Sequence, residues 1–443
     1  MTIRCIVEIC LVFGSTVFLS GQQLAATPPM GWNSWDAFGT TVRESEVRAN
    51  ADAMAALKQY GWEYVVIDIQ WYEPNAQAHG YRAGAKLSMD DHGRLIPAVN
   101  RFPSAAEGKG FKPLADYVHS KGLKFGIHIL RGVPRQAVEE NTVIDGAQVH
   151  AADVADRSSI CAWNTDMYGV DMSKPGAQSY YDSAVALYAS WGVDFIKADD
   201  MSRPYHQAEI EGLHKAIVHS GRSMVLSLSP GPAPIDELAD LRANAQMWRI
   251  EDDLWDDWGS LKNMEGRIEK WYALAQPGGW PDADMLPLGH IGLRAERGNN
   301  RLSSLTHDEQ RTMMTLWSIA RSPLMFGGDL ATLDPFTRSL IGNGEVLRVD
   351  QYSVENRLAY KANDLRVWTA RAGAGAAEKA IYVAIVNLGD QAVTQELKWS
   401  TIELHAPDGS VRDLWTGDSY PIGRSLAVKL APHASTFLKL TGR

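Results

Sequence analysis

Carboxylate side chains gather in four loops beside the predicted strands of this chain. They are Asp68 after the second strand, Asp199 and Asp200 after the fourth, the acids up to Asp253 after the sixth, and Asp282 with Asp284 at the start of the seventh. Each acid taken alone is explained as a helix N-cap, the commoner role of Asp in such loops. Together with Lys197 and Arg249, they match what cleavage of a glycosidic bond by two carboxyl groups requires.

Side-chain alternation separates the neighbouring acids of the fourth strand. Lys197 and Asp199 are two residues apart and point to the same side of the strand, so they can share the barrel mouth. Lys197 is then expected to keep Asp199 ionised, as a nucleophile requires, while Asp200 suits a helix cap or a supporting contact. For the general acid in the sixth loop the residues alone leave three candidates open: Glu251, Asp252 and Asp253.

A recurring unit predicts how these residues are positioned. A helical stripe ends at a Gly, and a run of β-forming residues follows, as around Gly61, Gly122 and Gly192. The predicted strands are Met30–Trp35, Tyr64–Asp68, Leu123–Ile127, Val193–Lys197, Met224–Leu228, Gln246–Ile250, Asp284–Leu288 and Ser322–Phe326. The last follows a helix that Thr306 and Glu309 begin as a capping box. Strands alternating with helices in this number favour an α/β fold with a closed (β/α)8 TIM barrel.

The sequence texture changes after about residue 345. Short alternating segments such as 380–386 are separated by turn signals at 387–390 and 407–409, as is typical of an antiparallel β-sandwich. No helix of useful length is predicted there. We therefore assign residues 26–345 to a catalytic (β/α)8 barrel and residues 346–443 to a C-terminal antiparallel β-sandwich.

Residues 1–25 are predicted to be a secretory signal peptide. Arg4 precedes an apolar stretch from Cys5 to Leu19, which ends in small residues. We expect export to the periplasm or the cell exterior, with no membrane attachment after cleavage. The mature chain would keep Cys161 as its one cysteine, so its stability should come from its core and not from disulfides.

The charge of the chain restricts its partners. A formal net charge of -10 argues against nucleic acid and anionic membranes, because both need a basic protein face. A neutral carbohydrate substrate fits better. The sequence does not determine the oligomeric state, for which a homodimer is one option.

Several motifs, matching in order, resemble the α-galactosidases of glycoside hydrolase family 27. They run from Pro29-Met30-Gly31-Trp32-Asn33-Ser34-Trp35 through Gly278-Gly279-Trp280-Pro281-Asp282-Ala283-Asp284-Met285 to the terminal sandwich. The resemblance covers nearly the whole mature chain. It implies a retaining exo-glycosidase that releases terminal α-D-galactose from oligo- or polysaccharides.

The resemblance also implies roles for individual residues. The nucleophile of the family falls on Asp199, and its acid/base, four residues after the Arg, falls on Asp253. The substrate-binding residues that it implies are Trp35 as the stacking aromatic, Asp68 for the axial hydroxyl, Lys197 and Arg249 for sugar contacts, and Asp284 as a contact near the acid.

Three departures from the family pattern concern the substrate. The family's galactosidases usually carry a second Asp directly after the first, where this chain has Ile69. An apolar residue cannot bind a 6-hydroxyl, so Ile69 favours β-L-arabinopyranose, which lacks that CH2OH group. Strict alternation turns Ile69 away from the mouth, so this interpretation requires the strand to end at Asp68. His128 replaces a frequent Tyr, and the segment beginning at Ser229 replaces a loop that contacts the 2-position, where Ser could admit a 2-acetamido group.

Neither His128 nor Cys161 predicts a metal site. No His or Cys at ligand spacing accompanies either residue, so we expect no metal and no cofactor. His128 is expected to line or support the site, and Cys161 to be a buried thiol. A competing hypothesis is a non-catalytic sugar-binding protein on the same fold, against which the retention of both Asp199 and Asp253 counts.

Overall fold

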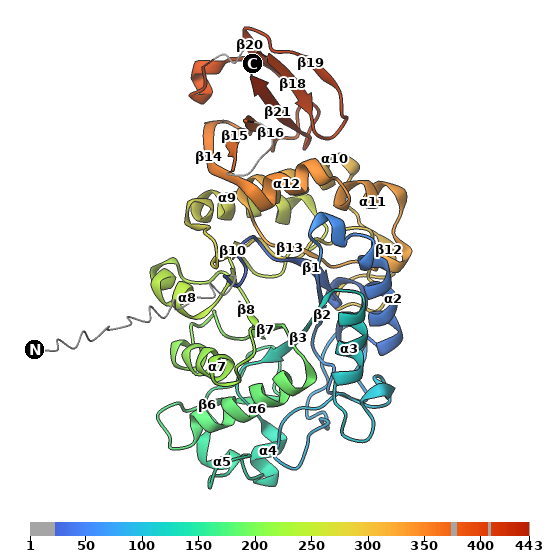
Figure 1. Cartoon of the computed structure of the whole chain (residues 1–443), viewed down its shortest axis with the longest axis vertical. Coiled ribbons are helices and arrows are strands. Elements are labelled where there is room, and N and C mark those ends of the chain that lie inside the picture. The colour runs from blue at the N-terminus through green and yellow to red at the C-terminus, as the bar shows by residue number, and fades with distance from the viewer. Residues whose placement is uncertain (1–22, 374–378, 406–408, 443) are drawn as a thin grey trace, which may run out of the picture.

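Eight parallel strands curl into a ring in the computed structural model of the chain, which describes residues 23–373, 379–405 and 409–442 (Figure 1). Around the sheet their order is β10-β9-β8-β7-β3-β2-β1-β13. Leu286 closes the ring, because its N–H donates to the Met325 carbonyl at 2.7 Å and its carbonyl accepts from Gly327 N–H at 3.0 Å. The predicted barrel is therefore confirmed.

The strands of the ring are short and largely buried, as parallel strands covered by helices must be. Their bounds are β1 Met30–Asn33, β2 Tyr64–Ile67, β3 Lys124–Leu130, β7 Phe195–Asp199, β8 Val225–Leu228, β9 Met247–Arg249, β10 Trp280–Asp282 and β13 Leu324–Phe326. Strand β2 ends at Ile67, so the side chain of Ile69 is not forced away from the barrel mouth by strand alternation. The interpretation that Ile69 contacts the sugar requires this.

The predicted strand at Asp284–Leu288 is wrong. The seventh ring strand is β10, and the apolar run that suggested the later position contributes only the bridge of Leu286 to Phe326. Pro281 lacks an N–H and is rare inside sheets, so the true strand has a weak sequence signal. As a result Asp282 ends β10 and Asp284 follows it, whereas the sequence placed both acids at the start of the strand.

Helices surround the ring. Their bounds are α1 Trp35–Phe38, α2 Glu44–Ala55, α3 Lys112–Ser120, α4 Arg135–Glu140, α5 Ala151–Val154, α6 Ala177–Trp191, α7 Gln207–His219, α8 Leu238–Asn244, α9 Trp258–Trp271, α10 His307–Ala320, α11 Pro335–Ile341 and α12 Gly344–Tyr352. The predicted capping box of α10 is present: the Thr306 side chain accepts from the N–H of Glu309, whose carboxylate accepts from Thr306 N–H. Gly192 ends α6 in the left-handed region at φ 87°, as predicted.

Short 3-10 helices and two small sheets fill the connections. The 3-10 helices are η1 Gly39–Thr41, η2 Lys58–Tyr60, η3 Pro103–Ala105, η4 Ile235–Glu237, η5 Tyr272–Leu274, η6 Leu330–Thr332 and η7 Trp399–Ile402. A three-stranded sheet of β4 Val133–Pro134, β5 Ala155–Asp156 and β6 Met167–Val170 stands between β3 and β7, and a hairpin of β11 His290–Ile291 and β12 Arg301–Leu302 follows β10. The sequence predicted neither insertion.

The predicted C-terminal antiparallel β-sandwich is also confirmed. Its strands are β14 Ser353–Ala362, β15 Leu365–Ala372, β16 Ala380–Asn387, β17 Val393–Lys398, β18 Gly409–Asp413, β19 Ser419–Pro421, β20 Ser425–Leu430 and β21 Ser435–Gly442. A six-stranded sheet, ordered β14-β15-β16-β21-β18-β19, packs against the β17–β20 pair over a core that includes Val367, Ile385 and Val428. The boundary predicted at residue 345 falls inside α12.

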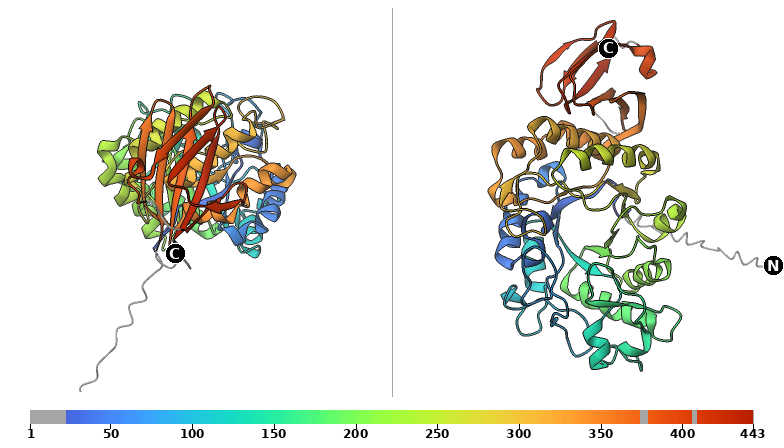
Figure 2. Two further views of the ribbon diagram at one scale, coloured as in Figure 1. Left: turned by 90° about the horizontal axis from the view of Figure 1, so that it is seen from above. Right: turned by 180° about the vertical axis from the view of Figure 1, so that it is seen from behind.

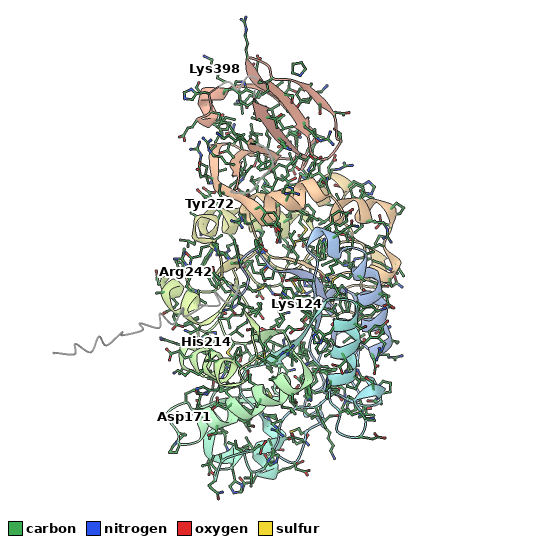
Figure 3. All side chains as sticks on the ribbon, in the orientation of Figure 1. Lys124, Asp171, His214, Arg242, Tyr272 and Lys398 are labelled. Atoms are coloured by element: carbon green, nitrogen blue, oxygen red, sulfur yellow. The ribbon has the colours of Figure 1, made fainter. Side chains whose placement is uncertain are left out.

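Helix α10 lies between the barrel and the sandwich, and most of its residues are buried (Figure 2). Thr312 donates to the carbonyl of His433 at 2.7 Å, and Trp415 donates to Thr315 at 3.0 Å. Tyr272 lies where the two domains meet and is labelled in Figure 3. Its ring packs edge-on against that of Trp368, with 4.9 Å between the ring centroids. The two domains therefore share a hydrophobic interface.

Candidate active site

A cavity of about 310 Å3 opens at the carboxyl ends of the ring strands, where barrel active sites lie. Both predicted catalytic acids line it. The residues around it are Trp35, Asp68, Ile69, Tyr81, Trp163, Lys197, Asp199, Arg203, Pro230, Asp252, Asp253, Glu296 and Arg297. A space of this size suits one or two sugar rings.

Asp199, at the end of β7, is held through both carboxylate oxygens. His128 Nε2 lies 3.1 Å from Oδ2, and the N–H of Asp200 donates to Oδ1 at 2.9 Å. Burial acts to raise the pKa of Asp199, but the hydrogen bond and charge of His128, together with the charge of Lys197, hold it below its ordinary value. Asp199 is therefore ionised at neutral pH, as a nucleophile must be.

Lys197 makes its direct ion pair with Asp68 and not with Asp199. Its Nζ donates to Asp68 Oδ2 at 2.8 Å, and Asn33 donates to the same oxygen at 2.7 Å. Burial would raise the pKa of Asp68, but Lys197 and His128 lower it, so this carboxylate stays charged and can accept a sugar hydroxyl. The expected effect of Lys197 on Asp199 remains, as a charge interaction without a hydrogen bond.

Arg249 joins the acids of the sixth and seventh strands. Its guanidinium lies 3.1 Å from Asp253 Oδ1 and 2.9 Å from Asp284 Oδ2. Burial and the nearby charge of Asp253 raise the pKa of Asp284, while Arg249 opposes this rise. Asp253 thus shares Arg249 with Asp284, a buried acid whose pKa is raised.

The structure separates the three candidates for the general acid. Glu251 pairs with Arg267 and does not belong to the cavity wall, whereas Asp252 and Asp253 both line it. Asp252 is engaged by Arg203 at 2.5 Å, and both side chains are about half exposed. Asp253, which faces Arg249 on the barrel side, is the better placed of the two.

The ten predicted site residues therefore fall into two groups. Six line the cavity: Trp35, Asp68, Ile69, Lys197, Asp199 and Asp253. The other four, His128, Ser229, Arg249 and Asp284, are buried beneath its wall. Pro230 lines the cavity in place of Ser229, whose hydroxyl has no hydrogen-bond partner among the residues that the structure describes. We call Asp68, His128, Lys197, Asp199, Arg249 and Asp284 the floor of the cavity.

Arg131 holds the backbone at Asp199 and at the residue that follows it. Its backbone N–H donates to the Asp199 carbonyl at 3.0 Å, and its Nε donates to the Asp200 carbonyl at 3.0 Å. The same side chain holds the Asp200 carboxylate at 2.8 Å and Glu209 at 2.7 Å, all in a buried cluster. Asp200 therefore supports the site, as the sequence suggested, but Arg131 was missed because its partner lies on another strand.

Sequence reasoning also missed most of the outer wall, which we call the rim. It consists of Tyr81 from the loop after β2, Trp163 from the loop between β5 and β6, Arg203 from the loop after β7, and Glu296 and Arg297 from the β11–β12 hairpin. Burial and the charges of Asp199 and Asp68 raise the pKa of Tyr81, so its hydroxyl stays protonated. Irregular loops carry no periodic signal that could have identified these residues.

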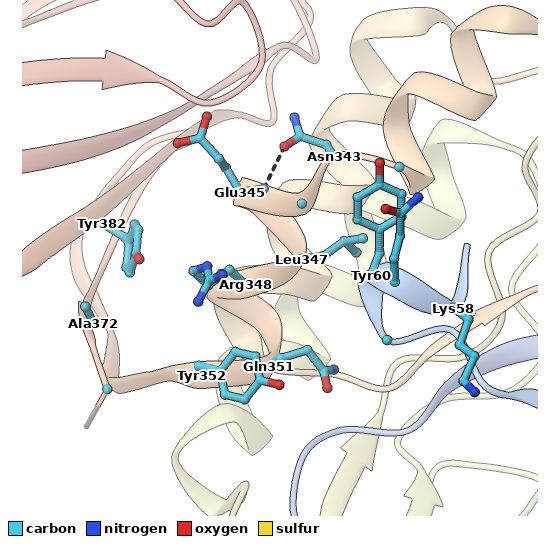
Figure 4. Close-up of a pocket in the computed structure, with 15 residues that line it drawn as sticks. Lys58, Tyr60, Asn343, Glu345, Leu347, Arg348, Gln351, Tyr352, Ala372 and Tyr382 are labelled. Atoms are coloured by element: carbon cyan, nitrogen blue, oxygen red, sulfur yellow. Dashed lines mark hydrogen bonds between the residues drawn. The ribbon is translucent and has the colours of Figure 1, made fainter. Parts of the chain in front are cut away.

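A larger cavity, of about 1070 Å3, lies away from this site, between η2, α12 and strands β15 and β16 (Figure 4). Its wall includes Tyr60, Arg348, Tyr352 and Tyr382. Among the described residues that line it, Glu345 is the one acid, and it pairs with Arg412 at 2.9 Å. The part of the chain that the structure describes therefore does not supply this cavity with the two carboxyl groups that glycosidic cleavage requires.

Within residues 23–373, 379–405 and 409–442, no group of three or more His, Cys, Asp or Glu could hold a metal ion. Cys161 is buried, and burial raises the pKa of its thiol to about 12. No helix in these same ranges combines the length and apolar character needed to cross a bilayer.

Two family models match most of the chain. The model described as alpha galactosidase A matches residues 27–174 and 135–352, and the model described as alpha galactosidase C-terminal beta sandwich domain matches residues 362–440. Together they include both domains and every floor residue.

Solved and curated relatives agree with the family models. The chain is similar to a GH27 β-L-arabinopyranosidase from Geobacillus stearothermophilus in complex with arabinose, with 52% identity, a TM-score of 0.91, and coverage of 95% of this chain and 98% of that chain. It is similar to a Bacillus halodurans protein provisionally assigned as an α-N-acetylgalactosaminidase, with 49% identity, a TM-score of 0.84, and coverage of 95% and 99%. An α-galactosidase of Coffea arabica is 31% identical over 408 residues, covering 90% of this chain and 89% of that protein.

Proposed function

Because the chain belongs to the α-galactosidase (melibiase) family, glycoside hydrolase family 27, and is a glycosidase, we propose that it hydrolyses terminal β-L-arabinopyranosides with retention of configuration. Asp199 is the nucleophile and Asp253 the acid/base. Terminal α-D-galactosides, which share the ring shape of arabinopyranosides, are turned over less efficiently.

The reaction proceeds by two displacements. Asp199 attacks the anomeric carbon while Asp253 gives its proton to the leaving oxygen, which breaks the glycosidic bond and forms a glycosyl ester on Asp199. Asp253, now a carboxylate, takes a proton from water, and the hydroxide that forms attacks the anomeric carbon and releases Asp199. Asp68 and Lys197 bind sugar hydroxyls, and Trp35 stacks on the ring.

Ile69 carries the choice of sugar. It lines the cavity directly after Asp68 and is buried, so its apolar side chain lies where the galactosidases of the family usually place a second carboxylate. A buried sugar hydroxyl left without a partner costs about 1 to 3 kcal/mol. The arabinopyranosidase among the similar structures supports the same assignment.

α-D-Galactoside is the second candidate substrate. Curated relatives from Arabidopsis thaliana and Coffea arabica, which cover 96% and 90% of this chain, are named α-galactosidases, and the motif match as a whole resembles their family. For an N-acetylgalactosaminide the support is weaker, because Ser229 lies beneath the wall while Pro230 forms it.

The deciding experiment compares kcat/KM for aryl β-L-arabinopyranoside, α-D-galactopyranoside and α-N-acetylgalactosaminide. The wild type should prefer the arabinoside. Ile69→Asp should shift preference towards the galactoside by about 5- to 150-fold, which corresponds to the cost of the unpaired hydroxyl. Ile69→Asn, which is uncharged and similar in size to Asp, controls for the added charge. A wild type that prefers galactoside by a wide margin would contradict the arabinopyranosidase assignment.

The same assay tests the non-catalytic alternative. Binding of arabinose or galactose by calorimetry without turnover of any of the three aryl glycosides would indicate a sugar-binding protein. The ionised state of Asp199 and the position of Asp253 in the same cavity favour turnover.

Export remains a proposal. The predicted signal peptide lies almost wholly within residues 1–22, outside the described residues. Cell fractionation and N-terminal sequencing of the protein made in its own host should give a periplasmic or extracellular protein that begins near residue 26. A full-length N-terminus in the cytoplasm would contradict export.

A further inference from the structure

Three aromatic rings follow one side of the active-site cavity from its interior to its mouth. Trp35 is 5% exposed, Tyr81 is half-buried and Trp163 is 38% exposed, and all three line the cavity. Tyr81 is nearly parallel to Trp35, with ring centroids 6.3 Å apart, and lies 5.3 Å from Trp163. The rings come from three separate segments of the chain, so the series is formed only by the fold.

The exposed ring of Trp163 stands on an anchored loop. Cys161 and Asn164 on either side of it are buried, and Asn164 Oδ1 accepts from the N–H of Asp166 at 2.8 Å. Gln70 in turn donates to Asp166 Oδ2 at 2.5 Å, which ties this loop to the segment after β2. A large aromatic face fixed towards the mouth of a cavity is available for a ligand, because burying its apolar surface lowers the free energy of the complex.

The charged residues of the rim and their partners are balanced in sign. Arg203 pairs with Asp252 at 2.5 Å, and Arg297 lies 4.0 Å from Glu296 and 5.5 Å from the ring centroid of Trp255. Two cations and two anions sum to no net charge, so the mouth does not select a charged group. The guanidinium N–H groups that these pairs leave free can donate to hydroxyls.

We propose that Tyr81 and Trp163 form a leaving-group subsite, which binds a neutral sugar ring next to the bond that is cleaved. The aromatic faces take the apolar face of the ring, and Arg203 and Arg297 donate to its hydroxyls. The natural substrate is then a neutral oligo- or polysaccharide in which the released sugar is linked to another sugar. This inference rests on the proposed function, because the subsite begins where the sugar bound over Asp199 ends.

The test compares leaving groups at a constant released sugar. A glycosyl fluoride has no ring to occupy the subsite, whereas a disaccharide with the same terminal sugar does. The fluoride and the disaccharide are each tested with β-L-arabinopyranosyl and with α-D-galactosyl as the released sugar. This distinguishes an error in the proposed sugar preference from an error in the proposed leaving-group subsite.

Trp163→Ala should lower kcat/KM for the disaccharide by about 3- to 10-fold and leave kcat/KM for the fluoride unchanged, since stacking on one ring is lost. Trp163→Phe should restore most of the loss. Tyr352→Ala, which removes an aromatic that is 58% exposed at the other cavity, is the matched control and should affect neither substrate.

Two results would overturn the subsite. Equal losses for fluoride and disaccharide would mean that Trp163 shapes the pocket of the released sugar, and unchanged values for both would mean that it contacts no substrate. If an octyl glycoside were cleaved better than the disaccharide, and if this depended on Trp163, the subsite would bind an alkyl leaving group and not a sugar ring.

Discussion

The floor and the rim of the cavity are built on opposite principles. Floor residues lie on or directly after ring strands, are almost fully buried, and meet their charge partners at short distances, as Lys197 and Asp68 do at 2.8 Å. Rim residues such as Arg203 and Trp163 come from loops and inserted segments and are substantially exposed. The difference indicates that the floor fixes the chemistry, while the rim adjusts which leaving group is accepted.

The largest effect should follow a change at the centre of the floor. Asp199→Asn keeps the size of the side chain but removes the attacking carboxylate, so kcat should fall by about 10^4-fold or more. Steady-state kinetics with aryl glycoside measure it, and circular dichroism confirms the fold. If the Asp199→Asn enzyme kept more than a tenth of the wild-type kcat, Asp199 would not be the nucleophile and the floor would not determine the chemistry.

Asp253 and Asp252 are neighbours in the cavity wall, where Asp253 pairs with Arg249 of the floor and Asp252 pairs with Arg203 of the rim. Asp253→Asn should lower kcat by about 10^2- to 10^4-fold for leaving groups that need a proton, because general acid catalysis is lost. Asp252→Asn loses only a half-exposed ion pair and should change kcat/KM by less than about 5-fold. The reverse order of effects would assign the acid/base role to Asp252.

Stability separates the buried from the exposed arginines. Arg131→Gln leaves Asp200 and Glu209 buried without their cation and should lower the free energy of unfolding by about 3 to 5 kcal/mol. Arg203→Gln breaks a rim pair and should cost about 1 kcal/mol or less. Urea unfolding of the two variants gives both values, and similar losses would show that exposure does not distinguish the two sites.

The smallest expected effect is a shift in pH dependence. Burial alone raises the pKa of Asp199, and His128 opposes it, so His128→Phe should raise this pKa. Because Asp199 must be ionised to attack, the acid limb of kcat/KM should move to higher pH. His128→Gln can still donate a hydrogen bond and should move the limb less. An acid limb that stays in place in both variants would exclude His128 from control of Asp199.

The same division explains what the sequence could predict. Alternation in a buried strand placed Lys197 and Asp199 on one side, and the motif match located Asp253 four residues after Arg249. The strand signal failed at β10, where Pro281 and two preceding glycines obscured a real strand and the apolar run after it appeared more regular. From the sequence, Ile69 could be placed in the cavity only on the condition that β2 ends before it, because the end of a strand depends on tertiary packing.

Contacts between distant loops were beyond sequence reasoning. Tyr81 and Trp163 are 82 positions apart in the chain, and nothing in their local sequence indicates that their rings meet 5.3 Å apart. Arg131 likewise carried no motif, although it holds the backbone at Asp199 and Asp200. Such residues are specified by the tertiary fold, since loops lack the periodicity from which pairing could be deduced.

The position of helix α10 affects how the enzyme unfolds. This helix contacts α9 and α12 of the barrel as well as β14, β16 and β21 of the sandwich, and Trp368 and Phe437 belong to the same hydrophobic cluster as the barrel core. Neither domain should therefore unfold without exposing apolar surface of the other. Heating should therefore produce a single calorimetric transition, and a chain truncated after Tyr352 should aggregate on expression instead of yielding an active barrel.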